Sequence, residues 1–208
     1  MSRIPPSPRR PAVRPRRASA AATRPQAVAL LTETFRRDGY DGASLATLSQ
    51  ATGLGKSSLY HYFPGGKVEM AHAVLDFSVD AARRHVFSVV AAPGPPAERL
   101  RELLRRMELF FERGTSACIL GRLSASVDRD RFREPLTRIF KAQRDAIARL
   151  LVEAGVPRPT ARARAEDTVI SIQGALVLSS GTGDPAPFQR MMARLRRDLL
   201  APVHRTGR

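Results

Sequence analysis

From Thr23 onward, apolar residues recur every three or four positions, and no alternation of apolar and polar residues is long enough to favour a strand. The stripe in residues 100–111 is an example, formed by Leu100, Leu103, Leu104, Met107 and Phe111. One face of an α-helix repeats at this spacing, so each stripe predicts a helix that buries one side. The sequence therefore predicts an all-α protein of about nine helices.

Capping residues, glycines and prolines set the expected helix boundaries. Thr23 and Gln26 have the spacing of a capping box, with Pro25 in the first turn, and this first helix ends at Gly39. Short helices at 44–51 and 56–63 follow, and a long one is expected over 67–90. Stripes at 100–111, 118–127, 132–150 and 160–179 predict four more, and the last helix begins at Pro185. Inward-facing residues of the first helix are Ala27, Leu30, Leu31 and Phe35.

The charge of the chain is strongly positive and unevenly distributed. The 208 residues include 35 Lys and Arg against 19 Asp and Glu, a net charge of +16. Residues 1–23 carry +6, residues 24–84 carry +1 and residues 85–208 carry +9. We therefore expect a negatively charged partner, but not one bound by a single basic motif.

Single residue types exclude several protein classes. The one cysteine, Cys118, cannot form an intrachain disulfide, and no apolar run approaches the length of a membrane span or signal peptide. The sequence therefore predicts a cytoplasmic protein. Six arginines and five prolines within residues 1–23 predict a disordered basic arm, either a nucleic-acid tether or a solvated tail.

Residues 44–63, SLATLSQATGLGKSSLYHYF, form the most informative motif. Two short helices joined by a tight glycine turn are typical of a helix-turn-helix DNA reader. Its inward positions are Leu45, Leu48, Ala51, Leu54, Leu59 and Phe63. The outer face of the second helix then carries a cation, hydroxyls, a phenol and an imidazole, which suit phosphates and base edges: Lys56, Ser57, Ser58, Tyr60 and His61.

At these residues the chain resembles a known family. Residues 24–84 are similar to the DNA-binding domain of TetR-family regulators, and LYHYFPGGK at 59–67 resembles the family's signature. FPGGK, together with IQGAL at 172–176, resembles the LmrA/YxaF-like branch. Gly65 and Gly66 put two residues between Pro64 and Lys67, where many members have one fewer.

The resemblance implies a role for each matching position. Lys56, Ser57, Ser58, Tyr60 and His61 face DNA, the last two mostly through their backbone. Ser44 and Thr47 on the preceding helix touch phosphate or a base edge, and Lys67 binds phosphate. The implied function is a ligand-responsive repressor, released from double-stranded operator DNA when effector binding tilts the fourth helix.

Residues 85–208 exceed what DNA reading needs, so we expect them to form a helical effector-binding and dimerisation domain. A symmetric dimer matches a palindromic operator. The expected dimer interface consists of apolar residues on the last two helices: Ile170, Gly174, Leu178, Phe188, Met191, Met192, Leu195 and Leu199. A pocket for a small lipophilic effector is expected to be lined by Val86, Phe87, Leu103, Met107, Phe110, Phe140, Val169 and Gln173.

The alternative functions are a non-specific DNA-packaging protein and an enzyme. The near-neutral reading domain argues against packaging, and no cluster of His, carboxylate, Ser or Cys has catalytic spacing outside that domain. His72 and His85 are thirteen positions apart, so we expect no metal, and no motif predicts a cofactor. Cys118 is interpreted as a buried inert thiol rather than a redox sensor.

Overall fold

The computed structural model describes residues 22–199, so the basic N-terminal segment lies almost entirely outside the described residues. Within them the all-α prediction is confirmed: there are nine α-helices, two short 3-10 helices and no strand. The helices of the helix-turn-helix region are α1 (Arg24–Gly42), α2 (Leu45–Thr52) and α3 (Lys56–Tyr62). The remaining helices are α4 (Gly66–His85), α5 (Pro96–Phe110), α6 (Ile119–Ser124), α7 (Arg129–Glu153), α8 (Arg158–Thr182) and α9 (Ala186–Asp198).

Local sequence signals explain how the first three helices begin and end. The capping box of Thr23 and Gln26 is present, and Ser44 Oγ accepts a hydrogen bond from Thr47 N at 3.1 Å. Gly53 takes a left-handed conformation at φ 68°, which a residue with a side chain rarely adopts, and this turns α2 into α3. Apolar side chains from all three helices close a small core of Leu31, Phe35, Leu48, Leu59 and Phe63, each fully buried.

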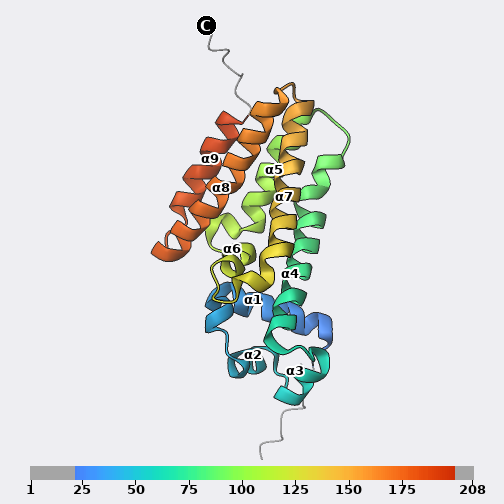
Figure 1. Ribbon diagram of the computed structural model, residues 1–208. Helices are drawn as coiled ribbons and strands as arrows, with labels where there is room; N and C mark the ends of the chain where they lie inside the picture. The colour runs from blue at the N-terminus through green and yellow to red at the C-terminus, as the bar shows by residue number, and fades with distance from the viewer. Residues whose placement is uncertain (1–21, 200–208) are drawn as a thin grey trace, which may run out of the picture.

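Helix α4 connects this small N-terminal unit to a helical bundle. In Figure 1, α4 rises from α1–α3 along α7, and α8 and α9 lie on the opposite side of the bundle. Helix α6 is packed between α1 and the bundle. Because α4 belongs to both parts, the boundary expected after Arg84 stays a prediction.

The end of α4 differs from the expectation of a helix through residue 90. The α-helix stops at His85, and a 3-10 helix, η1 (Phe87–Ala91), follows. Val86, Val89 and Val90 are β-branched, which weakens an α-helix, and all three are buried in the core. Packing therefore determines where α4 ends, because no glycine or proline marks a boundary at this point of the sequence.

One inward position of α1 was also wrong. Leu30 is 42% exposed, whereas Val28 and Thr34, which were not expected in the core, are buried. The buried side of α1 is therefore rotated slightly from the predicted one. Among the described helices, none combines the length and apolarity that a membrane crossing needs.

Candidate nucleic-acid interface and ligand cavity

Helix α3 presents a polar face that the small core holds in place. Leu59 and Phe63 are fully buried, while Lys56, Ser57, Ser58, Tyr60 and His61 are exposed. The guanidinium of Arg24 stacks on the Phe63 ring at 5.0 Å, and its Nε donates to the Tyr62 carbonyl at 3.3 Å. The end of α3 is thus fixed to α1, and its outer face is a rigid, accessible surface.

The two predicted contacts on α2 lie at the first turn of that helix. Ser44 is the N-cap, and its hydroxyl is 2.8 Å from that of Thr47. Ser44 is exposed and Thr47 half-buried, so both hydroxyls are oriented by the cap. Their place at a helix N-terminus suits a phosphate oxygen.

Lys67 is at the start of α4, as expected, but its ammonium group is engaged within the protein. Nζ lies 4.5 Å from the centroid of the Tyr40 ring and 3.5 Å from the Asp41 carbonyl oxygen. Burial lowers the pKa of Lys67. The structure brings Lys56, Ser57 and Ser58 together on one exposed face and does not place the Lys67 ammonium on it.

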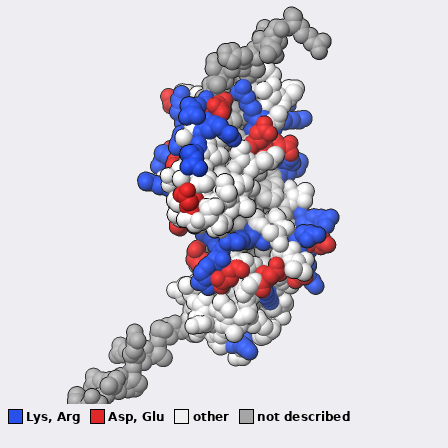
Figure 2. Space-filling model, turned by 90° about the vertical axis from the view of Figure 1, so that its left-hand side faces the viewer, with Lys and Arg blue, Asp and Glu red and all other residues white. Residues whose placement is uncertain are grey.

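The surface charge agrees with a reading domain that is nearly neutral. Lys56 is the one Lys or Arg in α2 and α3. Figure 2 shows the end of the molecule that carries these helices as mostly uncharged, with most blue groups lying over the bundle. Helices α2 and α3 can therefore form few ion pairs with DNA phosphates.

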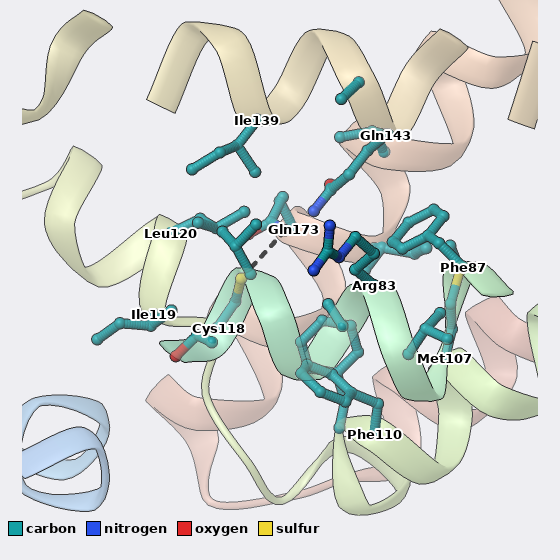
Figure 3. A pocket seen from close by; sticks show the side chains of 18 of the residues that line it. Arg83, Phe87, Met107, Phe110, Cys118, Ile119, Leu120, Ile139, Gln143 and Gln173 are labelled. Carbon is teal, nitrogen blue, oxygen red and sulfur yellow. Dashed lines mark hydrogen bonds between the residues drawn. The ribbon is translucent and has the colours of Figure 1, made fainter. Parts of the chain in front are cut away.

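A cavity of about 320 Å³ lies inside the bundle and is mostly apolar. Of the expected lining residues, the structure brings together Val86, Phe87, Met107, Phe110, Val169 and Gln173. Figure 3 shows that α5 contributes Met107 and Phe110 to the wall, while Gln173 reaches toward Cys118. The Gln173 amide donates a hydrogen bond to Cys118 Sγ at 3.4 Å, so this polar group has a partner in the cavity wall.

Leu103 and Phe140 do not line the cavity, which corrects their assignment. Leu103 is fully buried in the core, and Phe140 packs against that core away from the cavity. Sequence reasoning missed Arg36 of α1, Ser78 of α4 and Gln143 of α7, which line it. Gln143 follows Ile139 by four positions, and a polar residue on this apolar stripe was a signal that could have predicted it. No feature of the sequence predicted that Arg36 of α1 would reach the cavity.

The expected dimer residues divide between the two helices. On α8, Ile170 is 62% exposed, Leu178 is 54% exposed and Gly174 has open space around it, and Val177 extends this stripe. The expected residues of α9 are instead buried in the subunit's own core: Phe188, Met191, Met192, Leu195 and Leu199. This corrects their assignment, because side chains that are at most 9% exposed have little apolar area left for a partner.

No set of three or more potential metal ligands gathers among residues 22–199. His72 packs against the Phe132 ring at a centroid distance of 5.2 Å, and His85 is exposed at the end of α4. Cys118 is buried.

Two family models match consecutive parts of the chain. Residues 29–74 match the bacterial regulatory proteins of the tetR family, and residues 96–194 match the C-terminal domain of LmrA/YxaF-like transcriptional regulators. The chain belongs to the TetR family. This TetR-family protein is a helix-turn-helix transcriptional regulator and not an enzyme, as its sequence predicted.

Similar proteins and solved structures agree with this family assignment. The transcriptional regulator LmrA of Bacillus subtilis is 25% identical over 172 residues, covering 80% of this chain and 90% of the relative. A TetR regulator from Legionella pneumophila has the same fold, with a TM-score of 0.74, 15% identity and coverage of 86% and 97%. The TetR-family regulator CifR, solved with a 26-base-pair operator DNA, has a TM-score of 0.67, 21% identity and coverage of 89% and 99%.

Proposed function

We propose that this regulator is a dimeric repressor that reads a palindromic operator with α3 and is released by a small lipophilic effector. The observation that carries the proposal is the exposed polar face of α3, held by the buried Leu59 and Phe63. Hydroxyl, ammonium, phenol and imidazole groups on one short rigid helix match the chemistry of a major groove. The likeness to CifR, which was solved with operator DNA, supports this role.

Dimerisation is proposed through α8. A soluble chain rarely leaves a continuous apolar stripe in water, and Ile170, Val177 and Leu178 are spaced for one helix face. Gly174 lies on that face without a neighbour, so a second α8 can approach closely there. A symmetric dimer formed through this stripe would present two α3 helices, as a palindromic operator requires.

Effector control is proposed to act through α4. Three residues separate this helix from the end of α3, and the same helix contributes four residues to the cavity wall: Ser78, Val79, Ala82 and Arg83. A ligand that fits the cavity better in one orientation of α4 shifts the separation of the two α3 helices. A differential affinity of about 3 kcal/mol corresponds to operator binding about 150-fold weaker.

A footprint on the DNA upstream of the regulator's own gene tests the DNA function. A short protected palindrome supports a site-specific regulator, whereas uniform protection at rising concentration supports a DNA-packaging protein. Since the proposed partner is chromosomal DNA, the cytoplasm stays the expected location.

A further inference from the structure

The wall of the cavity contains two polar atoms that are buried without a hydrogen-bond partner. They are Arg36 Nε on α1 and Ser78 Oγ on α4. Ser78 is 5% exposed, and the side chain of Arg36 is 18% exposed. Among the described residues one further buried atom lacks a partner, Arg99 Nε, and it does not line the cavity.

Such atoms are unusual because a buried donor that loses water without gaining a partner is costly. Ser78 follows Val74 by four positions on α4, so it lies on the apolar stripe of this helix. Its hydroxyl occupies a position where the stripe predicts an apolar side chain. Arg36 forms an ion pair with Glu33 through Nη1, at 3.0 Å, and the Glu33 side chain is 67% exposed. Its Nε remains unused on a wall that is otherwise largely apolar.

The charge of the wall has one sign. Arg36, Arg83 and Arg138 line the cavity, and no Asp or Glu is among its described lining residues. Arg83 and Arg138 have side chains that are 74% and 69% exposed, so they lie where the cavity meets solvent. They pair there with Asp80 and Glu134. Figure 3 shows Arg83 extending toward Gln143.

Arg36 also occupies a special place in the chain. Among the described residues that line the cavity, it is the one that belongs to α1–α3. Its guanidinium lies 5.9 Å from the centroid of the Phe110 ring. The side chain therefore extends from helices α1–α3, the DNA-binding unit, to the part of the cavity wall formed by α5. A ligand bound to this group touches the DNA-binding unit directly.

We propose that the effector is an amphipathic acid, whose carboxylate binds Arg36 and whose apolar body lies among Phe87, Met107 and Phe110. The Ser78 hydroxyl donates to a further oxygen of the same ligand. An anion is favoured over a neutral polar group because the unpartnered Arg36 donor is charged and charge-assisted hydrogen bonds are about twice as strong as neutral ones. This inference rests on the proposed effector response of the cavity.

Displacement of a fluorescent dye tests it in the full-length protein. Phenylnaphthylamine, which is uncharged and brightens in apolar surroundings, reports occupancy, and Val169→Phe, which narrows the cavity, identifies the dye signal that comes from it. Decanoate and decanol, which share one chain and differ in the head group, serve as competitors. Decanoate is expected to displace the dye at a lower concentration than decanol.

Arg36→Met removes the guanidinium and keeps an apolar stem, so decanoate affinity is expected to fall at least about tenfold and decanol affinity less than about threefold. Arg138→Met is the matched control, since it removes an exposed lining arginine and is expected to cost less than about fivefold. Ser78→Ala is expected to raise the melting temperature, because it removes an unpartnered hydroxyl, and to weaken decanoate binding.

The outcomes separate this inference from the function on which it rests. Equal displacement by decanoate and decanol, or equal losses in Arg36→Met and Arg138→Met, overturns the acidic effector and leaves the cavity as an effector site. A dye that does not enter the cavity of the unaltered protein overturns the effector response as well. Operator affinity, measured separately, tells whether DNA reading stands in either case.

Discussion

At the scale of single residues, two lysines of the DNA-binding unit have different surroundings. Lys56 is exposed on α3, whereas Lys67 lies over the Tyr40 ring with a pKa lowered by burial. Contact between Lys67 and a phosphate requires its ammonium group to leave Tyr40 and the Asp41 carbonyl. The two side chains are therefore expected to respond differently to removal.

Lys56→Ala is expected to weaken operator binding and to reduce the slope of log K against log salt by about 0.9, because one phosphate contact is lost. Its melting temperature is expected to stay unchanged, since the side chain is exposed. Lys141→Ala is the control, because Lys141 is 68% exposed on α7 and far from α3 in the chain. Titrations at three salt concentrations check this, and equal slopes for both variants would remove α3 from the DNA surface.

Lys67→Ala is expected to lower stability by about 0.5–1 kcal/mol through loss of the cation–π contact with Tyr40. Thermal unfolding of Lys67→Ala beside Lys56→Ala measures the difference. A variant that melts normally but loses operator affinity would instead assign Lys67 to phosphate binding, as the family resemblance implied.

At the scale of helices, the sequence predicted what depends on neighbours in the chain. Ser44, Gly53 and the glycine-proline breaks act locally, so the helix-turn-helix and its exposed face on α3 could be derived before the structure. The end of α4 could not, because burial of Val86, Val89 and Val90 depends on helices distant in sequence. Arg36 in the cavity was missed for the same reason, since periodicity on α1 contains no information about α5.

Helix α5 is joined to η1 by an ion-pair network whose stability depends on pH. Arg105 and Arg106 donate to Glu102 and lower its pKa from 4.5 to about 2, while Arg106 Nη1 donates to Ser88 at 2.9 Å. A lowered carboxyl pKa stabilises the fold above its ordinary pKa, and this contribution is lost as pH falls from 4.5 through about 2.

Glu102→Gln is therefore expected to lower stability at pH 7 by less than about 1 kcal/mol, as for other partly exposed pairs. Chemical unfolding of both proteins at pH 7 and at acid pH checks this. The difference is expected to shrink as pH falls below 4.5. A difference that is constant with pH would mean that packing, not charge, is responsible.

The turn before α6 depends on the close approach of Gly114 to α9. Gly114 has φ 100°, and a Cβ there would lie 2.7 Å from Phe188 Cβ. Gly114→Ala is expected to destabilise by more than about 1 kcal/mol beyond the strain of its conformation. Gly155→Ala, with φ 90° and nothing within 4 Å, measures that strain alone. Equal melting temperatures for the two variants would show that Phe188 moves aside freely.

At the scale of the whole molecule, the apolar stripe of α9 is buried within the chain, whereas the stripe of α8 is exposed. Periodicity predicted both, but burial against the chain's own helices and burial against a second chain produce the same pattern. Only the fold distinguishes the buried Phe188 and Met192 from the exposed Ile170, Val177 and Leu178. The interface on α8 is therefore a proposal that the α9 residues no longer support.

Leu178→Arg is expected to shift the protein from dimer to monomer while keeping its helical content, because it places a charge in the proposed apolar interface. Leu109→Arg is the control, since Leu109 is 49% exposed on α5, outside the stripe. Light scattering at several concentrations measures the mass. A Leu178→Arg variant that stays dimeric would place the interface elsewhere.

The uncovered stripe on α8 also bears on how sharply a gene controlled by this protein responds. If two chains must associate before one operator is filled, occupancy at low protein levels rises with the square of chain concentration rather than in proportion to it. Halving synthesis then reduces operator occupancy about fourfold in that range, since each binding event needs two copies. Ile170, Val177 and Leu178 would thus set the steepness of the response in the cell, although none of them belongs to α3 or lines the cavity.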